Sequence, residues 1–261
     1  MLEKFRTAKQ AEIENLRAMD QAGTLADLWT RPRPPFAQAL RDRAAAEGVA
    51  VIAEYKRASP SKGDINLAFT PGQVAELYAK SGAAAISVLT EEVYFKGSLD
   101  YLGIMAASNL PLLRKDFLFH PLQVRQTAST SASALLLIAR MFRSATELAR
   151  MLNLAEGFGL EAVTEVFDRA DLDRAREAGA DIIQVNNRDL DTMTISLDNS
   201  RTLVRERSDR ELWISASGIS EPHEVKEMAG LGFTAVLVGT SIMASGDPGD
   251  KLRQLAQGAK A

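Results

Sequence analysis

The chain has 261 residues, of which 46% are hydrophobic and 25% charged, so it can bury a full core as one large domain or two small ones. Its formal net charge of −3 gives no overall reason to expect binding to nucleic acid or to an anionic membrane. It contains no cysteine, and its two histidines are far apart, so we expect no disulfide and no metal site. No apolar run approaches the roughly 20 residues of a membrane span, and residues 1–6 have no apolar signal core. We therefore expect a cytoplasmic protein.

The first part of the chain has helical periodicity. The pattern predicts an amphipathic helix whose apolar face carries Leu2, Phe5, Ile13, Leu16 and Met19. A turn-rich string, RPRPP at residues 31–35, separates it from a second helical pattern at residues 36–46. We expect residues 1–48 to form a helical extension of a single domain.

From residue 51 onward, short apolar runs alternate with longer amphipathic segments. The apolar runs predict eight strands, at residues 51–55, 84–89, 110–114, 134–138, 162–166, 182–185, 213–217 and 235–238. Gly82, Gly179 and Gly232 mark returns from helix to strand. Eight such units in about 210 residues suit a (β/α)8 barrel, because a doubly wound open sheet usually has fewer strands. The predicted fold is α/β, a (β/α)8 TIM barrel at residues 49–261.

Charged side chains end three of these strands, where an ordinary buried strand carries none. Because side chains alternate across a strand, Glu54 and Lys56 share one face. If that face, Lys115, Glu165 and Asn186 all point inward, the groups converge at the carboxyl end of the barrel, where barrels carry their catalytic residues. A buried ion-pair network is the alternative interpretation. Such a network is costly unless it is well paired, so the pattern favours an active site.

Glycines and hydroxyl groups follow the first, seventh and eighth predicted strands. The strings are ASPSKG at residues 58–63, SASGI at residues 215–219 and LVGTS at residues 237–241. The first string includes a lysine and could bind an anion, but by itself it is more typical of a simple turn. The loops after strands seven and eight, however, are where barrels commonly bind phosphate through backbone N–H groups. The sequence therefore predicts a phosphorylated small-molecule substrate.

The string IAEYKRASPSKG at residues 52–63 closely resembles the opening motif of indole-3-glycerol phosphate synthases. Further matches follow in order: SVLTE at residues 87–91, LRKDF at 113–117, VNNRDL at 185–190 and VGTSIM at 238–243. The resemblance covers nearly the whole chain, including the extension. It implies a barrel lyase of tryptophan biosynthesis that closes the indole ring of 1-(2-carboxyphenylamino)-1-deoxyribulose 5-phosphate with loss of CO2 and water. It also implies that no cofactor or metal is needed, and we expect a monomer.

The same resemblance implies roles for individual residues. Lys115 matches the general acid, Glu165 the acid/base carboxylate of the dehydration, and Glu54 with Lys56 the charged pair of the first strand. These groups suit a reaction in which a carbonyl is polarised and a hydroxyl then leaves as water. Phe117 and the extension helix would contact the aromatic ring, although ordinary packing also explains Phe117. The other implied site residues are Asn186 and Ser217, the phosphate contacts Ser59, Gly218, Gly239 and Thr240, and the loop residue Arg188.

The sequence departs from the family pattern at three places. Ala216 stands where the family usually has glutamate, Phe167 where histidine is common, and SAS at residues 131–133 replaces Gly-Ala-Asp. Ala216 is either a natural variant or a deliberate substitution, and it leaves open a catalytically impaired, phosphate-binding barrel. Retention of the catalytic residues argues against that alternative. A phosphoribosylanthranilate isomerase would instead carry Cys/Asp or Asp/Asp on strands one and five, where this chain has Glu54 with Lys56, and Glu165.

Overall fold

The computed structural model describes residues 2–189 and 192–259. The chain begins with helices α1 (Leu2–Ala8) and α2 (Gln10–Gln21), and α3 (Phe36–Glu47) follows after a linker. The second predicted helical segment is confirmed by α3. The first is divided into two helices at Lys9, whose side chain is buried with only 4% of the residue exposed.

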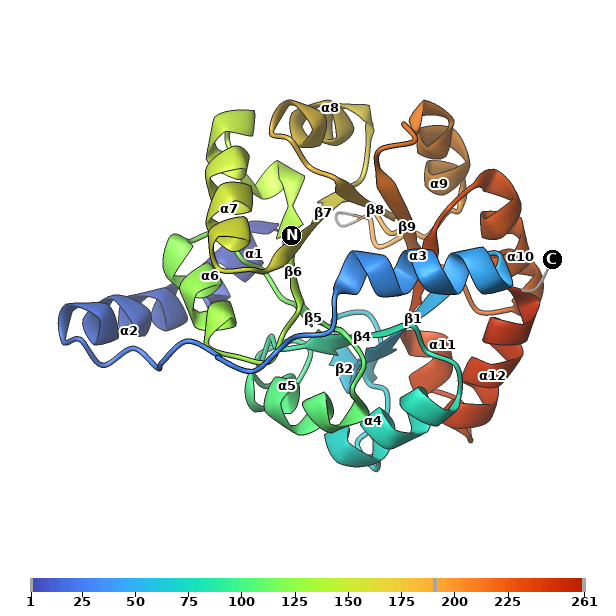
Figure 1. The fold of residues 1–261 in the computed structure, drawn as a ribbon, viewed down its shortest axis with the longest axis horizontal. Helices are drawn as coiled ribbons and strands as arrows, with labels where there is room; N and C mark the ends of the chain where they lie inside the picture. The colour runs from blue at the N-terminus through green and yellow to red at the C-terminus, as the bar shows by residue number, and fades with distance from the viewer. Residues whose placement is uncertain (1, 190–191, 260–261) are drawn as a thin grey trace.

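Eight parallel strands close into a barrel in the order β1, β10, β9, β8, β7, β6, β5, β4 and back to β1 (Figure 1). The strands are β1 (Ala50–Tyr55), β4 (Ala85–Leu89), β5 (Leu112–Lys115), β6 (Ala134–Ile138), β7 (Glu161–Val166), β8 (Ile182–Asn186), β9 (Leu212–Ala216) and β10 (Ala235–Val238). All eight predicted strands are confirmed, with bounds that differ by at most two residues. The predicted TIM barrel is therefore correct.

Helices surround the barrel (Figure 1). They are α4 (Pro71–Lys80), α5 (Asp100–Met105), α6 (Pro121–Ala128), α7 (Ala145–Gly157), α8 (Arg169–Glu177), α9 (Asp198–Leu203), α10 (Pro222–Leu231), α11 (Thr240–Met243) and α12 (Pro248–Gly258), with 3-10 turns η1 (Ala106–Ser108), η2 (Ala139–Met141) and η3 (Val204–Glu206). At the start of α4, Thr70 and Gln73 cap each other's backbone N–H groups. The glycines that the sequence predicts between a helix and the next strand, Gly82, Gly179 and Gly232, all have positive φ.

The side chains of β5 alternate as predicted. Arg114 points toward α6, where it donates to Gln123 O at 3.2 Å and to Thr127 Oγ1 at 2.9 Å. The next residue, Lys115, lines a cavity at the carboxyl end of the barrel. One charged side chain of this strand therefore serves packing, and its neighbour faces the site.

A small hairpin follows β1. It consists of β2 (Ala58–Ser59) and β3 (Gly63–Asp64), paired antiparallel with Ser59 opposite Gly63. The sequence predicts a turn or an anion-binding loop here, not a strand pair. The hairpin keeps residues 58–64 beside the carboxyl ends of the strands.

The extension contacts both ends of the barrel. At the amino end, the carboxylate of Glu161 at the start of β7 accepts hydrogen bonds from Phe36 N at 2.5 Å and Ala37 N at 2.9 Å, which fixes the start of α3. At the carboxyl end, Phe5 of α1 stacks on Phe117 with ring centroids 3.8 Å apart. The extension is thus packed onto the barrel at two places.

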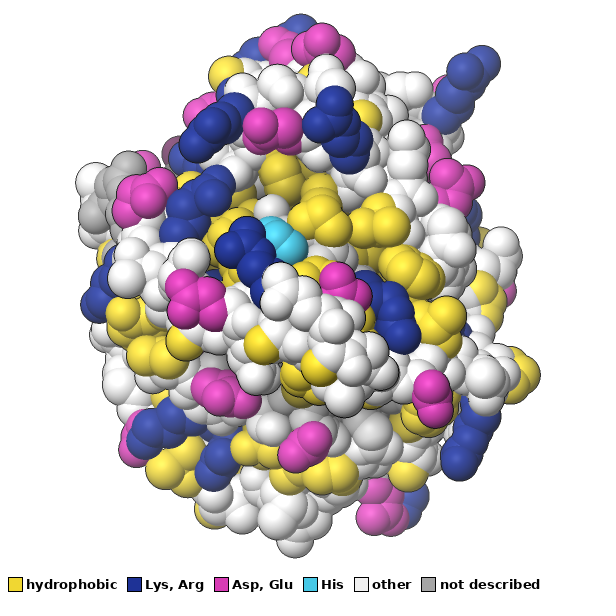
Figure 2. All heavy atoms as spheres, turned by 90° about the vertical axis from the view of Figure 1, so that its left-hand side faces the viewer, with side chains coloured by type: hydrophobic (Ala, Val, Ile, Leu, Met, Phe, Trp, Pro, Cys, Tyr) yellow, Lys and Arg dark blue, Asp and Glu magenta, His cyan; other side chains and the backbone are white. Residues whose placement is uncertain are grey.

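Helix α2 projects from one side of the barrel (Figure 1). Figure 2 shows that side, with hydrophobic side chains gathered in its middle and Lys, Arg, Asp and Glu side chains around them. Because both signs of charge are interspersed, this side offers no continuous basic surface to a nucleic acid. No helix of the described residues is long and apolar enough to cross a lipid bilayer.

Candidate active site

Five of the predicted site residues meet where β1, β5, β7 and β8 end. Lys56, Lys115, Glu165 and Asn186 line two adjoining cavities, and Glu54 lines one of them. Glu54 and Glu165 are each only 2% exposed. The parallel register of the closed barrel brings together groups that are more than a hundred residues apart in the sequence.

Glu54 is held as a carboxylate. Its Oε1 lies 2.7 Å from Lys56 Nζ, and its Oε2 accepts a hydrogen bond from Ser87 Oγ at 3.3 Å. Burial has the largest single effect on the pKa of Glu54 and tends to raise it. The charges of Lys56 and Lys115 and the two hydrogen bonds together outweigh it, so the pKa of Glu54 is lower than that of an ordinary glutamate. Glu54 therefore stabilises a positive charge on Lys56.

Lys115 and Glu165 face each other across the site. Lys115 Nζ lies 3.9 Å from Glu165 Oε2, too far for a direct hydrogen bond. The same carboxylate oxygen accepts a hydrogen bond from Gln184 Nε2 at 2.5 Å, which fixes its orientation. An ammonium and a carboxylate placed in this way can give a proton to, and take a proton from, a molecule bound beside them.

Asn186 and Arg188 lie on the β8 side of the site. Asn186 Oδ1 accepts a hydrogen bond from the backbone N–H of Arg188 at 3.0 Å, and Arg188 Nη1 lies 3.4 Å from Ser61 Oγ. Burial lowers the pKa of Arg188 while the charge of Glu54 acts in the opposite direction, and the guanidinium stays protonated. Arg188 is thus a half-buried part of the site, and not a freely exposed loop residue. Leu190, the last residue of the VNNRDL motif, lies outside the described residues.

Ser217 has a backbone conformation that is rare for a residue with a side chain. Its φ is +70°, and its carbonyl oxygen accepts a hydrogen bond from Asn187 Nδ2 at 3.1 Å. The same amide donates to Ser215 Oγ at 3.0 Å. Such conformations persist only where the surroundings hold them, and they cluster at functional sites.

The wider of the two cavities has a volume of about 300 Å³. Gly218, Gly239 and Thr240 line it, together with Lys62, the lysine of the ASPSKG string. A Cβ atom at Gly239 would clash with the carboxylate of Glu54, so a larger residue there would displace this carboxylate. This cavity combines glycine backbone, hydroxyl groups and lysine, which suits an anion.

The narrower cavity has a volume of about 90 Å³ and mostly apolar walls. Its apolar lining consists of Phe5, Pro60, Leu89, Phe95, Phe117, Leu136, Ile138 and Met193. Phe95 lies 6.3 Å from Phe5 and 6.2 Å from Phe117, measured between ring centroids. Ser59, which the family resemblance groups with Gly218, Gly239 and Thr240 as a phosphate contact, lines this narrow cavity instead of the wide one.

Several lining residues were not identified from the sequence. The sequence predicts that the extension helix and Phe117 contact an aromatic ring, and Phe5 is the extension residue in that place. Phe5 could have been identified because it lies on the apolar face of the helix that the sequence predicts. Phe95 and Met193 come from loops, where periodicity carries no information.

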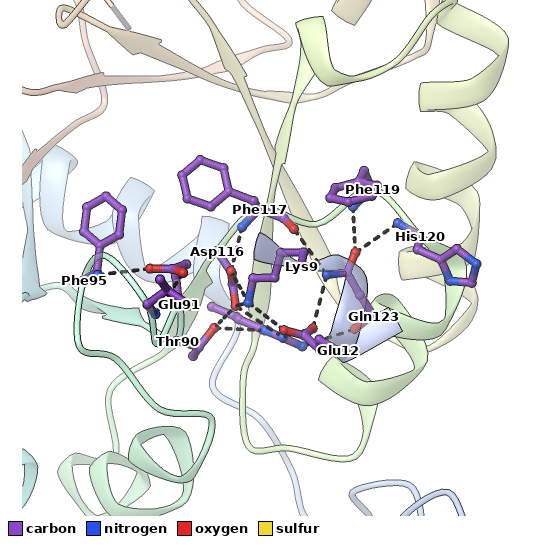
Figure 3. A network of polar contacts seen from close by, with 12 residues as sticks. Lys9, Glu12, Thr90, Glu91, Phe95, Asp116, Phe117, Phe119, His120 and Gln123 are labelled. Atoms are coloured by element: carbon purple, nitrogen blue, oxygen red, sulfur yellow. Dashed lines mark hydrogen bonds and ion pairs between the residues drawn. The ribbon is translucent and has the colours of Figure 1, made fainter. Parts of the chain in front are cut away.

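A buried polar network joins the extension to the residue after Lys115 (Figure 3). Lys9 Nζ lies 2.7 Å from Asp116 Oδ1 and 2.6 Å from Glu12 Oε2, and Thr90 Oγ1 donates to Asp116 Oδ2 at 2.6 Å. Burial tends to raise the pKa of Asp116. The charges of Lys9 and Arg114, with the hydrogen bonds, outweigh burial and lower this pKa. Asp116 is therefore a buried carboxylate that fastens the extension beside the site.

The charge of the site suits an anionic ligand. Four cationic side chains line the two cavities, against three carboxylates: Lys56, Lys62, Lys115 and Arg188 against Glu54, Asp116 and Glu165. Asp116 is also paired with Lys9, which lies outside both linings. In the described part of the chain, no group of three or more His, Asp or Glu side chains is placed to hold a metal ion.

Comparisons with known proteins agree with this geometry. A family model described as indole-3-glycerol phosphate synthase matches residues 2–255. An indole-3-glycerol phosphate synthase from Roseiflexus sp. is 41% identical over 271 residues, covering 99% of this chain and 98% of that protein. One from Aquifex aeolicus is 43% identical over 211 residues, covering 80% of this chain and 81% of that protein.

Among solved structures, 3-hexulose-6-phosphate synthase from Salmonella typhimurium has a similar fold, with a TM-score of 0.65 and 17% identity over 81% of this chain and 98% of that chain. That likeness concerns the barrel fold alone. The family model and the two relatives concern the sequence over most of its length, and on their evidence the chain belongs to the indole-3-glycerol phosphate synthase family.

Proposed function

We propose that the protein is an indole-3-glycerol phosphate synthase, which closes the indole ring of 1-(2-carboxyphenylamino)-1-deoxyribulose 5-phosphate and releases CO2 and water. The observation that carries the proposal is the junction of the two cavities. The residues that line both are Lys56, Lys115, Glu165, Asn186, Arg188 and Ser217. The substrate has an aromatic ring at one end and a phosphate at the other, so its reacting carbons would lie at this junction.

The two ends of the substrate fit different cavities. Its carboxyphenyl ring packs against Phe117 in the narrow cavity, and its phosphate binds at Gly218, Gly239 and Thr240 in the wide one. The family resemblance also assigns Ser59 to the phosphate, although this residue lines the narrow cavity. Holding both ends fixes the ring carbon near the carbonyl carbon that it attacks.

Ring closure is the first step. The ring carbon that bears the carboxylate attacks the ketone carbon of the ribulose portion, and Lys115 gives a proton to the carbonyl oxygen as the C–C bond forms. The attacking ring loses its aromaticity as the C–C bond forms, and departure of CO2 restores it. Lys56 and Arg188 supply positive charge for the substrate carboxylate before it leaves.

Dehydration is the second step. The new hydroxyl group leaves as water after protonation, and the neighbouring CH2 loses a proton to form the indole double bond. Glu165 is the acid/base group of this step, because its carboxylate lies beside Lys115 and can exchange protons there. Asn186 and Ser217 hold substrate hydroxyl groups in place, and Glu54 forms an ion pair with Lys56.

Ala216 supports one competing function, a barrel that binds phosphate without turnover. It lines the wide cavity and lies next to Asn186 of β8 and Leu237 of β10. The paired charges of Glu54 with Lys56, and the facing Lys115 and Glu165, favour the enzyme over this alternative.

We also propose that the protein acts as a cytoplasmic monomer, in which the extension at residues 1–48 and the barrel at residues 49–261 form one working unit. A single working unit is supported because Phe5 of the extension lines the narrow cavity together with residues of the barrel. A cytoplasmic location is supported because a substrate with a phosphate and a carboxylate does not cross a bilayer unaided. No nucleic acid, membrane or cofactor is part of this proposal.

The test is a fluorescence assay that follows formation of indole-3-glycerol phosphate from the purified carboxyphenylamino-deoxyribulose phosphate. We expect indole fluorescence to rise as an equal amount of CO2 is released. Competition by inorganic phosphate should slow the reaction. Binding of phosphate without any product would instead support the impaired barrel.

A further inference from the structure

The loop after β4, residues 91–97, is held by a buried carboxylate that the proposed reaction does not use. Glu91 is 1% exposed. Its Oε1 accepts a hydrogen bond from Val93 N at 3.0 Å, and its Oε2 accepts from Tyr94 N at 2.7 Å and Phe95 N at 3.0 Å. Figure 3 shows this carboxylate pointing toward the backbone of Phe95.

Burying a carboxylate is costly unless donors surround it. Within the described residues, Glu91 forms no ion pair with a lysine or arginine, so the backbone N–H groups of its own loop are what stabilise the charge. Hydrogen bonds to an ionised acceptor are stronger than neutral ones. The carboxylate therefore fixes the path of residues 93–95.

The far end of the loop is fixed as well. Gly97 N donates to the carbonyl oxygen of Glu91 at 2.8 Å. A Cβ atom at Gly97 would clash with the carbonyl oxygen of Leu89, so the loop returns tightly onto the end of its strand. Both ends of the loop are therefore held in place.

This loop presents two aromatic rings around Phe5. Phe95 lines the narrow cavity, and Tyr94 makes an edge contact with Phe5 at 5.3 Å between ring centroids. Phe5 in turn stacks on Phe117. The position of the backbone at residues 94–95 therefore sets the shape of the narrow cavity.

We propose that Glu91 is a positioning residue that shapes the narrow cavity for the aromatic ring of the substrate. It lines neither cavity, so it acts through the backbone N–H groups of Tyr94 and Phe95. The inference rests on the proposed function, because that function places the carboxyphenyl ring in this cavity.

The experiment compares Glu91→Gln with Glu92→Gln, which makes the same chemical change at the exposed neighbouring residue. Glutamine keeps one acceptor oxygen and turns an N–H2 group toward the backbone donors. We expect Glu91→Gln to raise KM for the substrate about tenfold, the scale of a lost charge-assisted hydrogen bond, with little change in kcat. Inhibition by inorganic phosphate, which binds in the other cavity, should be unchanged. Glu92→Gln should behave as the wild type.

A double-mutant cycle with Phe95→Ala tests whether Glu91 acts through the loop. In the Phe95→Ala background, Glu91→Gln should raise KM by less than about twofold, because the ring that it positions is gone. If the double variant instead shows the product of the two separate fold-increases in KM, Glu91 does not act through Phe95, and the inference is overturned. An equal weakening of phosphate inhibition would also overturn it, because this would indicate a general loss of structure.

If Glu91→Gln does not fold, Glu91→Asp replaces it, since aspartate keeps both oxygens and withdraws them by one methylene. The same pattern is expected, with KM raised about threefold. Failure of the wild type and of Glu92→Gln to form product would refute the proposed function itself. Product from both, with an unchanged KM in the Glu91 variant, would overturn only the role of Glu91.

Discussion

Replacing Lys9 with methionine is expected to lower the free energy of unfolding by about 3 kcal/mol. The Lys9 and Asp116 side chains are 5% and 0% exposed, and their charged atoms lie 2.7 Å apart. Methionine keeps most of the apolar stem but removes the ammonium group, which leaves Asp116 as an undercompensated buried charge. Removing one partner of a buried pair costs about 3–5 kcal/mol. The low end applies because Thr90 Oγ1 and Phe117 N still donate to Asp116.

Urea unfolding followed by circular dichroism measures this loss. Lys226→Met is the matched control, because Lys226 is an exposed residue of α10, and it should change the free energy of unfolding by less than about 0.5 kcal/mol. Asp116→Asn and the double variant complete a cycle with Lys9→Met. The double variant should lose less stability than the two single losses added together, because the charges are removed as a pair.

A Lys9→Met variant as stable as Lys226→Met, or two single losses that simply add, would show that Lys9 and Asp116 are not an energetically coupled pair. Acid provides a further check. The pKa of Asp116 is lowered in the folded protein, because the effect of burial is outweighed by the charges of Lys9 and Arg114 and by hydrogen bonds. Its contribution is therefore present above the ordinary aspartate pKa and is lost as the pH falls below about 4. The stabilities of the wild type and Lys9→Met should converge in that range.

Three further predictions concern catalysis and binding. Lys115→Ala should lower kcat by about 100-fold or more in steady-state kinetics, the effect of losing a general acid, and wild-type turnover by a folded variant would exclude that role. Inorganic phosphate should compete with the substrate, and Gly239→Ala should weaken that inhibition because its Cβ would clash with Glu54; equal inhibition of both proteins would place the phosphate elsewhere. Ala216→Glu should raise kcat/KM about tenfold, for a hydrogen bond worth roughly 1.5 kcal/mol, while lowering the melting temperature through repulsion with Glu54 and Glu165. An unchanged or lower kcat/KM in a folded Ala216→Glu variant would show that this position is not a lost substrate contact.

The barrel could be predicted because each strand is a short apolar run bounded by turn residues. The largest difference is at β5, predicted from residue 110 but beginning at Leu112. Pro111 has no N–H group to donate to a neighbouring strand, and an apolar run by itself does not show where pairing begins. Alternation of side chains then indicated the inward residues at the strand ends.

The extension was harder to predict. An amphipathic pattern continues across Lys9, so nothing local shows that the helix is divided there. The partner of Lys9 is Asp116, 107 residues further along the chain. Such a pairing depends on the closed barrel, which a local pattern does not contain.

The walls of the narrow cavity were only partly predictable for the same reason. Phe117 lies two residues after the end of β5, whereas Phe95 lies in a loop whose shape depends on the buried carboxylate of Glu91. A glutamate in a loop is normally solvent-exposed, so its burial could not be inferred from its residue type.

The central claim is that one molecule spans both cavities with its reacting carbons between Lys115 and Glu165. A crystal structure of the protein with indole-3-glycerol phosphate tests it most directly. We expect the indole ring among Phe5, Phe95 and Phe117, and the phosphate at Gly218, Gly239 and Thr240. An indole ring in the wide cavity, or a phosphate away from both glycines, would contradict the account.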